Sequence, residues 1–535
     1  MGRTTCACRR TAVVITKGWR LWSISLSQSK LAPVPEPERT SASPNLRPTC
    51  ARARRWGFRI AAVGVGLLPL VTVEIVLRLL GVAAPASGTD PLAGFNRQLR
   101  LFERVQGRCQ VIRSREPFFQ PQSFAVVKPT NGYRIFCLGG STVYGHPYLA
   151  DTAFPKWLEL ELAATHPGRR VEAVNCGGIS YASYRLAPIV REVLAYQPDL
   201  IVLAMGHNEF LEDRTYQPLK LRSDPRRWWE DRFNSLHLTA LARSLFTRPT
   251  RDPSMSGTPE GGEQLPAEVS ARLDGGTGYA SYHRDDEWHG QVIAQFSDAF
   301  RSMIDACRVA QVPVLVVTLG SNLRDCPPFK SEHRAGLSTE AELRWQVAFD
   351  AGTAAEAHDL RAALAHYQAA AAIDDQHALL AFRIARCHDR LGQVSEARMH
   401  FLRAKELDVC PLRMGEEIYQ LQHGIAAETR TPVVDARLLL EAASPQALPG
   451  NDQYLDHVHP TVAGHQRIAQ AIAAKLPLAR LIQAGEPWPL AERRTVYRDH
   501  LRTLPVSYFP NGFRRVEWLE NWAKRERLRE ETLPM

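Results

Sequence analysis

Three residues from two distant parts of the chain have the types that nucleophilic catalysis needs. Ser141 lies in the run GGST, and Asp456 and His459 lie in the late run LDHVHP. A carboxylate three residues before a histidine can accept a hydrogen bond from one ring nitrogen, leaving the other to take a proton from a serine hydroxyl. We therefore predict Ser141 as nucleophile, His459 as general base and Asp456 as the acid that orients it. His457 is the alternative base, but it is two residues from His459 and should point elsewhere.

A second set of residues could stabilise negative charge beside Ser141. The run GHNE contains Asn208, and it directly follows an apolar stretch. A side-chain amide at this position can donate to the oxyanion of a tetrahedral intermediate. The alternatives are plain: Asn208 is an ordinary loop asparagine, and a Gly-Gly-Ser turn by itself is more often structural than catalytic.

These residues follow the ends of short apolar runs that alternate with helix-like stretches. Such alternation predicts a parallel sheet covered by helices on both faces. The carboxyl ends of its strands are where open α/β folds bind ligands. The predicted strands are 133–138, 171–175, 200–205, 312–319 and, after a long interruption, 432–435.

The interruption has a period of 34 residues. Ala363, Tyr367 and Ala370 recur as Ala397, Phe401 and Ala404. This resembles the tetratricopeptide repeat, in which small residues let paired helices pack closely. A plain helical hairpin is the alternative.

The order of the four blocks, strand-GGST, strand-NCGGIS, strand-GHNE and a late DHVH, resembles the SGNH/GDSL hydrolase superfamily over about 131–344 and 411–480. The resemblance implies a flavodoxin-like three-layer αβα fold and esterase chemistry. It also implies that Ser141 supplies a backbone oxyanion donor and Asn208 a side-chain donor. The family's second block places a donor glycine about five residues after the strand-end Asn. Here that count from Asn175 reaches Ser180, with Gly178 as the rival.

Two further features resemble a bacterial membrane-anchored subgroup with repeat insertions: the apolar segment before the domain, and the run SNLRD followed by PPF. Asn322 in that run could line the site or cap its strand.

Residues 58–82 form the apolar segment. Taken as a helix to Leu80, the stretch from Ile60 is about 31 Å long, enough to cross a bilayer. Arginines before it predict a cytoplasmic N-terminus and an extracytoplasmic catalytic domain at the bacterial inner membrane. A cleaved signal peptide, with an A-x-A site at Ala84-Pro85-Ala86, and a buried core helix are the alternatives.

Composition excludes several classes. The formal charge is +10, yet residues 1–57 hold eleven Lys/Arg and only two Asp/Glu, so the rest is nearly neutral and a nucleic-acid partner is not expected. The ten cysteines contain no CxxC pair, so neither a metal nor another cofactor is predicted. A Gly-, Pro- and Ser-rich stretch at 245–285 predicts a flexible loop.

The expected function is therefore a membrane-anchored serine esterase acting on an ester-bearing small molecule, a lipid or an acetylated glycan, with a protein partner possible at the repeats. The alternatives are an O-acetyltransferase of envelope polysaccharide and a non-enzymatic repeat scaffold. The predicted segments are a disordered basic tail (1–57), a transmembrane helix (58–82), a linker (83–130), the hydrolase domain in two parts (131–344 and 411–480), the helical insertion (345–410) and a C-terminal extension (481–535).

Overall fold

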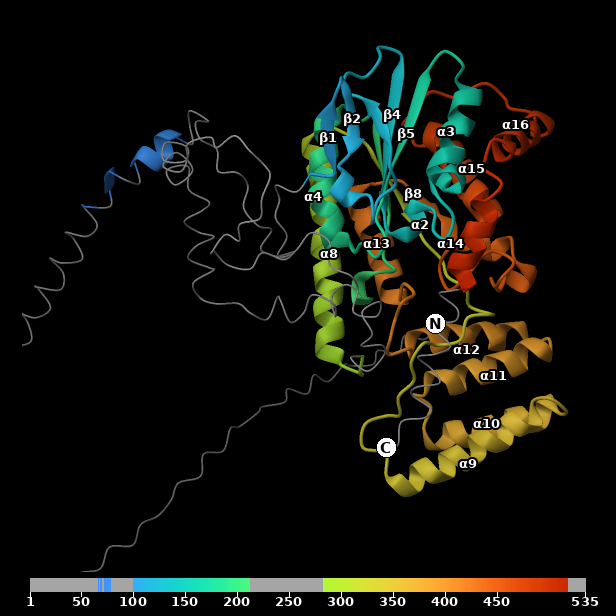
Figure 1. The fold of residues 1–535 in the computed structure, drawn as a ribbon. Coiled ribbons are helices and arrows are strands. Elements are labelled where there is room, and N and C mark those ends of the chain that lie inside the picture. Colours follow the sequence, from blue (N-terminus) through green and yellow to red (C-terminus); the bar gives the residue numbers. More distant parts are fainter. Residues whose placement is uncertain (1–65, 67, 70–71, 78–99, 212–281, 518–535) are drawn as a thin grey trace, which may run out of the picture. The chain divides into compact units, whose positions relative to one another are not determined.

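The computed structural model describes residues 66, 68–69, 72–77, 100–211 and 282–517. The chain divides into two units, 1–71 and 72–535, and the fold below is that of the second. Its centre is a parallel sheet (Figure 1) with the order β5-β4-β6-β7-β8. The strands are β4 (Gly132–Gly139), β5 (Arg170–Gly177), β6 (Leu200–Ala204), β7 (Val314–Thr318) and β8 (Val433–Asp435).

The predicted parallel sheet is confirmed, and its strands β6 and β7 read as almost wholly apolar runs for a physical reason. Every residue of β6 and of β7 is buried. A parallel strand covered by helices on both faces has no solvent side, so both alternating sets of side chains are apolar.

Helices cover both faces of the sheet. On one face α3 (Phe154–Thr165) packs on β5, and α15 (Val462–Leu478) packs on α3 and β8. On the other, α4 (Ser183–Val193) packs on β4, α13 (Glu416–Thr429) packs on β7, and both contact α8 (Asp286–Val309). Numbered along the chain, the strands run 2-1-3-4-5, which is the flavodoxin-like order that was predicted.

The prediction that residues 83–130 form a linker is wrong for the described part of this segment. Three antiparallel strands form there: β1 (Phe102–Val105), β2 (Arg108–Val111) and β3 (Ser123–Ala125). Phe102 and Phe124 lie edge-to-face at 5.1 Å, and Phe124 contacts Phe136 of β4 at 5.4 Å. This small sheet therefore shares the main hydrophobic core.

The C-terminal extension also packs on this core. In α16 (Leu490–Arg502), Tyr497 donates to Glu161 of α3 at 2.6 Å, and its ring lies 4.6 Å from that of Trp157. Further along, the Tyr508 hydroxyl accepts from the amide of Leu149 at 3.0 Å. Helix α16 and Tyr508 thus pack on α3 and on the loop that follows the Ser141 turn.

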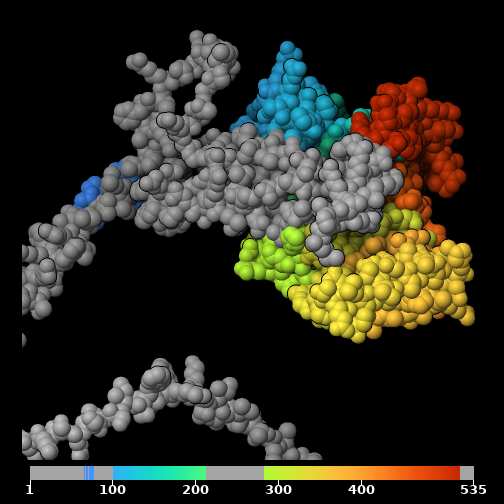
Figure 2. Space-filling model, turned by 60° about the horizontal axis from the view of Figure 1, so that its bottom comes forward, coloured from blue at the N-terminus to red at the C-terminus, as the bar shows by residue number. Residues whose placement is uncertain are grey.

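The interruption between β7 and β8 is two helical hairpins, α9 (Thr339–Ala355) with α10 (Leu360–Ile373) and α11 (Ala378–Arg390) with α12 (Val394–Glu406). Their surface is yellow and orange in Figure 2. The residues that recur after 34 positions are all buried, in α10 and in α12. The predicted start at 345 falls inside α9, and Cys410, which the prediction gave to the insertion, packs in the main core.

Most of the predicted membrane segment 58–82, and all but the end of the predicted loop 245–285, lie outside the described residues. Within the described ranges, the model has no helix with the length and apolar character that crossing a bilayer requires. The transmembrane helix therefore stays a prediction.

Candidate active site

Ser141 begins a short helix directly after β4. Gly140 precedes α2 (Ser141–Tyr144) in an extended conformation. A Cβ added to Gly139 would lie 1.9 Å from the carbonyl oxygen of Ala204, and one added to Gly140 would lie 2.5 Å from Nδ2 of Asn208. The two glycines are needed because the end of β6 and its loop approach the backbone here.

The end of β5 holds this turn from the other side. Asn175 donates from Nδ2 to the carbonyl of Val143 at 2.7 Å and accepts from the amide of Gly177 at 2.9 Å. An added Cβ on Gly177 would meet the Tyr144 amide nitrogen at 2.1 Å. The run NCGGIS therefore positions the nucleophile helix.

Asp456 and His459 lie on a tight loop before α15. The loop is closed by a bridge between Tyr454 and Pro460, and Leu455 donates to the carbonyl of His459 at 2.8 Å. The structure brings the three predicted catalytic residues together. Nδ1 of His459 lies 2.5 Å from Oδ2 of Asp456, and its Nε2 lies 2.7 Å from Oγ of Ser141.

The electrostatics keep Asp456 ionised. Burial alone would raise the pKa of this carboxyl. The neighbouring His459 and His457, with hydrogen bonds from His459 Nδ1 and the Val458 amide, hold the pKa well below its usual range. The carboxylate thus accepts from Nδ1–H of His459, and in this tautomer Nε2 faces the Ser141 hydroxyl as an acceptor.

His457 lies on the other side of the same carboxylate. Its Nδ1 is 3.5 Å from Oδ1 of Asp456, and its ring meets Phe329 edge-to-face at 5.1 Å. Burial lowers the pKa of His457 to about 4, so the ring is neutral near pH 7. His459, rather than His457, is the histidine in contact with Ser141.

The predicted oxyanion donors differ in what their N–H groups already bind. Nδ2 of Asn208 lies beside Gly140 and donates one of its two protons to the carbonyl of Tyr181 at 3.1 Å. Its second proton can therefore be donated to an oxyanion. The amide of Gly178 donates to the carbonyl of Gly139 at 2.9 Å, so Gly178 as donor is wrong: its proton is already used.

Ser180 is the better candidate for the second-block donor. Its φ of 58° lies in the left-handed region that favours glycine. Within the described residues, no acceptor pairs with its amide. Ser180 therefore combines a backbone conformation that glycine adopts readily with an amide free to donate among the described residues. The amide of Ser141, as the first residue of α2, likewise has no intrahelical acceptor.

Sequence reasoning missed His146, five residues after the nucleophile. Its ring centroid is 4.7 Å from that of His459. Burial, together with the charge of His459, lowers the pKa of His146 to about 3, so it is a neutral packing partner of the base. A histidine this close behind Ser141 in STVYGHP was the available signal.

Asn322 caps the acid loop. Its amide donates to the carbonyl of His457 at 2.9 Å, and its Nδ2 donates to the carbonyl of Asp456 at 3.2 Å. Asn322 lies four residues beyond the end of β7, so it braces the acid loop rather than capping its strand. In the described part of the chain, no group of three or more His, Cys, Asp and Glu side chains could hold a metal ion.

Fold and site together define an open α/β protein with a serine, a histidine and an aspartate in hydrogen-bond contact at the carboxyl end of its sheet. The chain matches no protein-family model and no curated protein sequence.

Solved structures similar to this chain include three named for ester hydrolysis or lipolysis. A putative lipolytic protein of the G-D-S-L family from Desulfitobacterium hafniense is 9% identical, with 65% of this chain and 99% of that chain covered at a TM-score of 0.28. An acetyl-xylooligosaccharide esterase from Geobacillus is 13% identical, with 64% and 94% covered at 0.29. A lipase/acylhydrolase from Enterococcus faecalis is 11% identical, with 66% and 100% covered at 0.29. At this level of similarity, the role of Ser141 rests on the site geometry alone.

Proposed function

We propose that the chain is a serine hydrolase that cleaves carboxylic esters. The observation that carries this is the continuous contact from Asp456 through His459 to Ser141, at 2.5 and 2.7 Å. A buried carboxylate that fixes the histidine tautomer, and a ring nitrogen within reach of a serine hydroxyl, are what acyl transfer requires.

The reaction has two steps. Ser141 Oγ attacks the ester carbonyl while Nε2 of His459 takes its proton, and the proton then passes to the leaving alcohol. Water attacks the acyl-enzyme in the same way, releases the acid and restores the serine. Asn208 and the backbone amides of Ser141 and Ser180 donate to the oxyanion in both steps.

Ser141→Ala tests the proposal. A panel of acyl esters, lipids and acetylated glycans is assayed with wild type, Ser141→Ala, His459→Ala and His457→Ala, and each protein is probed with a serine-directed fluorophosphonate. We expect Ser141→Ala and His459→Ala to lower turnover by about 10³-fold or more, and His457→Ala to lower it much less.

Full turnover by Ser141→Ala would overturn the proposal, and a dead His457→Ala beside an active His459→Ala would reverse the assignment of the base. Assays with an added sugar acceptor identify acetyl transfer, the second predicted activity. A chain inert with every ester, and unlabelled by fluorophosphonate, would favour the scaffold.

We further propose, from the sequence of residues 58–82 and the arginines before it, that one helix holds the chain in a bacterial inner membrane with its catalytic domain outside the cytoplasm. A reporter fused after Met535 should be active only outside the cytoplasm, in the membrane fraction. A soluble mature chain beginning near Ser87 would show signal-peptide cleavage instead. We also propose that the tetratricopeptide-like hairpins bind a protein partner.

A further inference from the structure

The chain returns from the helical insertion to the core through residues 408–415, which we call the return segment. It connects α12 with α13 and contacts two loops of the candidate site. One is the 320s loop that caps Asp456, and the other is the GHNE loop that carries Asn208.

Arg413 makes the first contact. It is only 3% exposed, and its Nη1 donates to the carbonyls of Asn322 at 3.2 Å and Cys326 at 3.0 Å. Asn322 in turn donates to the backbone of Asp456 and His457. The guanidinium is therefore two hydrogen bonds away from the backbone that orients the acid.

Asp408 compensates the buried charge of Arg413. Its Oδ2 lies 3.5 Å from Nη2 of Arg413, and its carboxylate accepts from the amides of Phe329 at 2.8 Å, Lys330 at 3.0 Å and Cys410 at 3.1 Å. Removing Arg413 alone would leave a buried carboxylate without its counter-charge.

Met414 makes the second contact with both of its backbone polar groups. Its amide donates to Nδ1 of His207 at 3.1 Å, and its carbonyl accepts from Nζ of Lys405 at 3.0 Å. Lys405 belongs to α12, and His207 precedes Asn208. Burial lowers the pKa of His207 to about 3, so the ring is neutral and Nδ1 keeps the lone pair that this bond needs.

Met414 also packs closely against the GHNE loop. Gly206 has a φ of 127°, and a Cβ there would lie 2.4 Å from Sδ of Met414. The loop that carries Asn208 is thus held in two ways: the Met414 amide donates to the His207 ring, and the Met414 side chain packs against Gly206.

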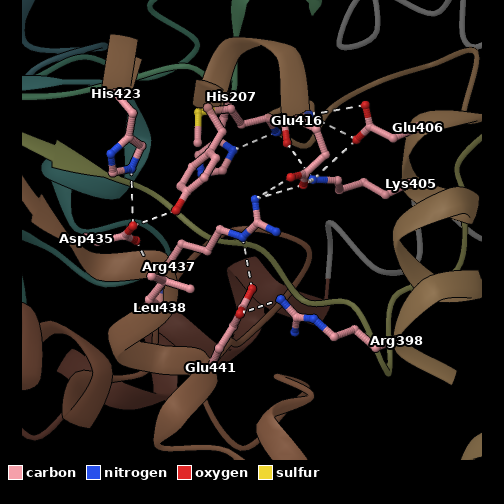
Figure 3. Close-up of polar contacts among 12 residues, drawn as sticks. His207, Arg398, Lys405, Glu406, Glu416, His423, Asp435, Arg437, Leu438 and Glu441 are labelled. Carbon is pink, nitrogen blue, oxygen red and sulfur yellow. Dashed lines mark hydrogen bonds and ion pairs between the residues drawn. The ribbon is translucent and has the colours of Figure 1, made fainter. Parts of the chain in front are cut away.

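A charged network holds the insertion on the core and meets the return segment at Lys405 (Figure 3). Arg398 of α12 donates to Glu441 at 2.7 Å and to the carbonyl of Ala447 at 3.1 Å. Arg437 of α14 (Ala436–Ala442) pairs with Glu441 and with Glu416, which also accepts from Lys405. Arg398 and Lys405 lie on one helix and both bind the core, but only Lys405 donates directly to Met414, the residue that binds His207.

We propose that Arg413 and Lys405 are positioning residues of the hydrolase site: Arg413 sets Asp456 through Asn322, and Lys405 sets Asn208 through Met414 and His207. The insertion and its return segment thereby fix the distance between the acid and the oxyanion donor. This inference rests on the proposed function, because it assigns roles relative to the Ser141 reaction.

The first test separates positioning from stability in the full-length protein. Arg413→Met should lower both the melting temperature and kcat. The double variant Asp408→Asn with Arg413→Met removes the uncompensated charge but leaves the Phe329 amide without its acceptor, so its melting temperature should recover in part while kcat stays low. Because a misplacement of about 1 Å can cost about 100-fold, we expect kcat to fall by about 10- to 100-fold with KM little changed.

The second test compares two residues of one helix. Lys405→Met should lower kcat, and Lys405→Arg should restore most of it by donating to the Met414 carbonyl. Arg398→Met, which removes a contact between the insertion and Glu441, should lower the melting temperature while keeping wild-type kcat.

Equal kcat losses in Lys405→Met and Arg398→Met would overturn the positioning role of Lys405, since both would then act only through docking of the insertion. A double variant of Asp408 and Arg413 with normal kcat would do the same for Arg413. Ser141→Ala in the same series keeps the two proposals apart: if it remains active, the proposed function fails, whatever the other variants do.

Discussion

At the scale of residues, the candidate site depends on close approach. Ser141 and the pair Asp456 and His459 come from segments more than three hundred residues apart, and folding brings them into hydrogen-bond contact. Gly140 lets the Asn208 amide lie against the nucleophile turn, because any side chain there would occupy the same space. The position of the oxyanion donor Asn208 beside the nucleophile therefore depends on the absence of a side chain at residue 140.

This coupling predicts the behaviour of Gly140→Ala and Asn208→Ala. Asn208→Ala should lower kcat by about 10²- to 10³-fold with little effect on KM, since one oxyanion donor is lost. Gly140→Ala should lower kcat too, because its Cβ would lie 2.5 Å from Nδ2 of Asn208 and displace it.

Gly168→Ala is the matched control, because a Cβ there has no described atom within 4 Å. Steady-state kinetics on the best ester of the panel, with circular dichroism for folding, measure the set. Wild-type kcat in Asn208→Ala would remove this residue from the oxyanion site.

At the scale of elements, the insertion leaves and re-enters the core at one point. Val409 donates to the carbonyl of Lys330 at 3.2 Å, and Asp408 binds the amides of Phe329 and Lys330. The inner hairpin packs Phe382 and Phe401 around Leu323 and Leu448 of the core. In the outer hairpin, the buried cluster around Trp345 and Tyr367 draws its residues from the insertion itself.

Because the two ends of the insertion lie next to each other, we predict that the insertion can be removed without unfolding the core. Replacing residues 332–406 with a short Gly/Ser linker should leave a folded core that reacts with a fluorophosphonate, because Lys330, Asp408 and Arg413 are retained. Its turnover should fall, since Lys405 is lost, and its melting temperature should fall, since Leu323 and Leu448 become exposed.

Fluorophosphonate labelling and thermal unfolding measure the outcome, with Ser141→Ala in the same excised chain as the labelling control. An unfolded product would show that the hairpins are part of the core.

At the scale of the whole molecule, the strand order decides where the site lies. In the order 2-1-3-4-5, the connections leave β4 and β6 in opposite directions, so the carboxyl ends of these neighbours are where open α/β folds bind ligands. Ser141 follows β4 and Asn208 follows β6, so the strand order places nucleophile and oxyanion donor at this point. The small N-terminal sheet and the C-terminal helix pack on the same core.

The free energy of unfolding of the whole molecule should depend on pH through one buried carboxyl, that of Asp408. Burial raises the pKa of Asp408 to about 6, against the lowering effect of Arg413 and of backbone hydrogen bonds. A group with a raised folded pKa contributes stability that is fully present below its unfolded pKa, about 3.8, and is lost as pH rises through about 6.

The free energy of unfolding of wild type minus that of Asp408→Asn should therefore fall between about pH 4 and pH 6.5, by at most about 3 kcal/mol at 1.36 kcal/mol per pKa unit. Urea unfolding of the full chain at several pH values, followed by tryptophan fluorescence, measures this difference. A difference that stays constant with pH would show that Asp408 has an ordinary pKa.

The sequence by itself determined the five parallel strands, the candidate triad and the helical period. Strands buried on both faces must be continuous apolar runs, the chemistry of acyl transfer admits few residue types, and a 34-residue spacing of small side chains reflects helix packing within a short stretch of chain. The strands and the helical period are local signals, whereas the triad was found from the order of four short blocks along the chain.

Only the tertiary structure decided between Gly178 and Ser180, because the choice depends on whether the amide of Gly178 is already bound to Gly139, on the neighbouring strand. It also revealed the sheet at 102–125, whose short strands of mixed polarity are stabilised by packing on Phe136. The return segment is a further case. Arg413 and Met414 look ordinary in the sequence, and they acquire a role only because folding brings them against Asn322 and His207, 91 and 207 residues away.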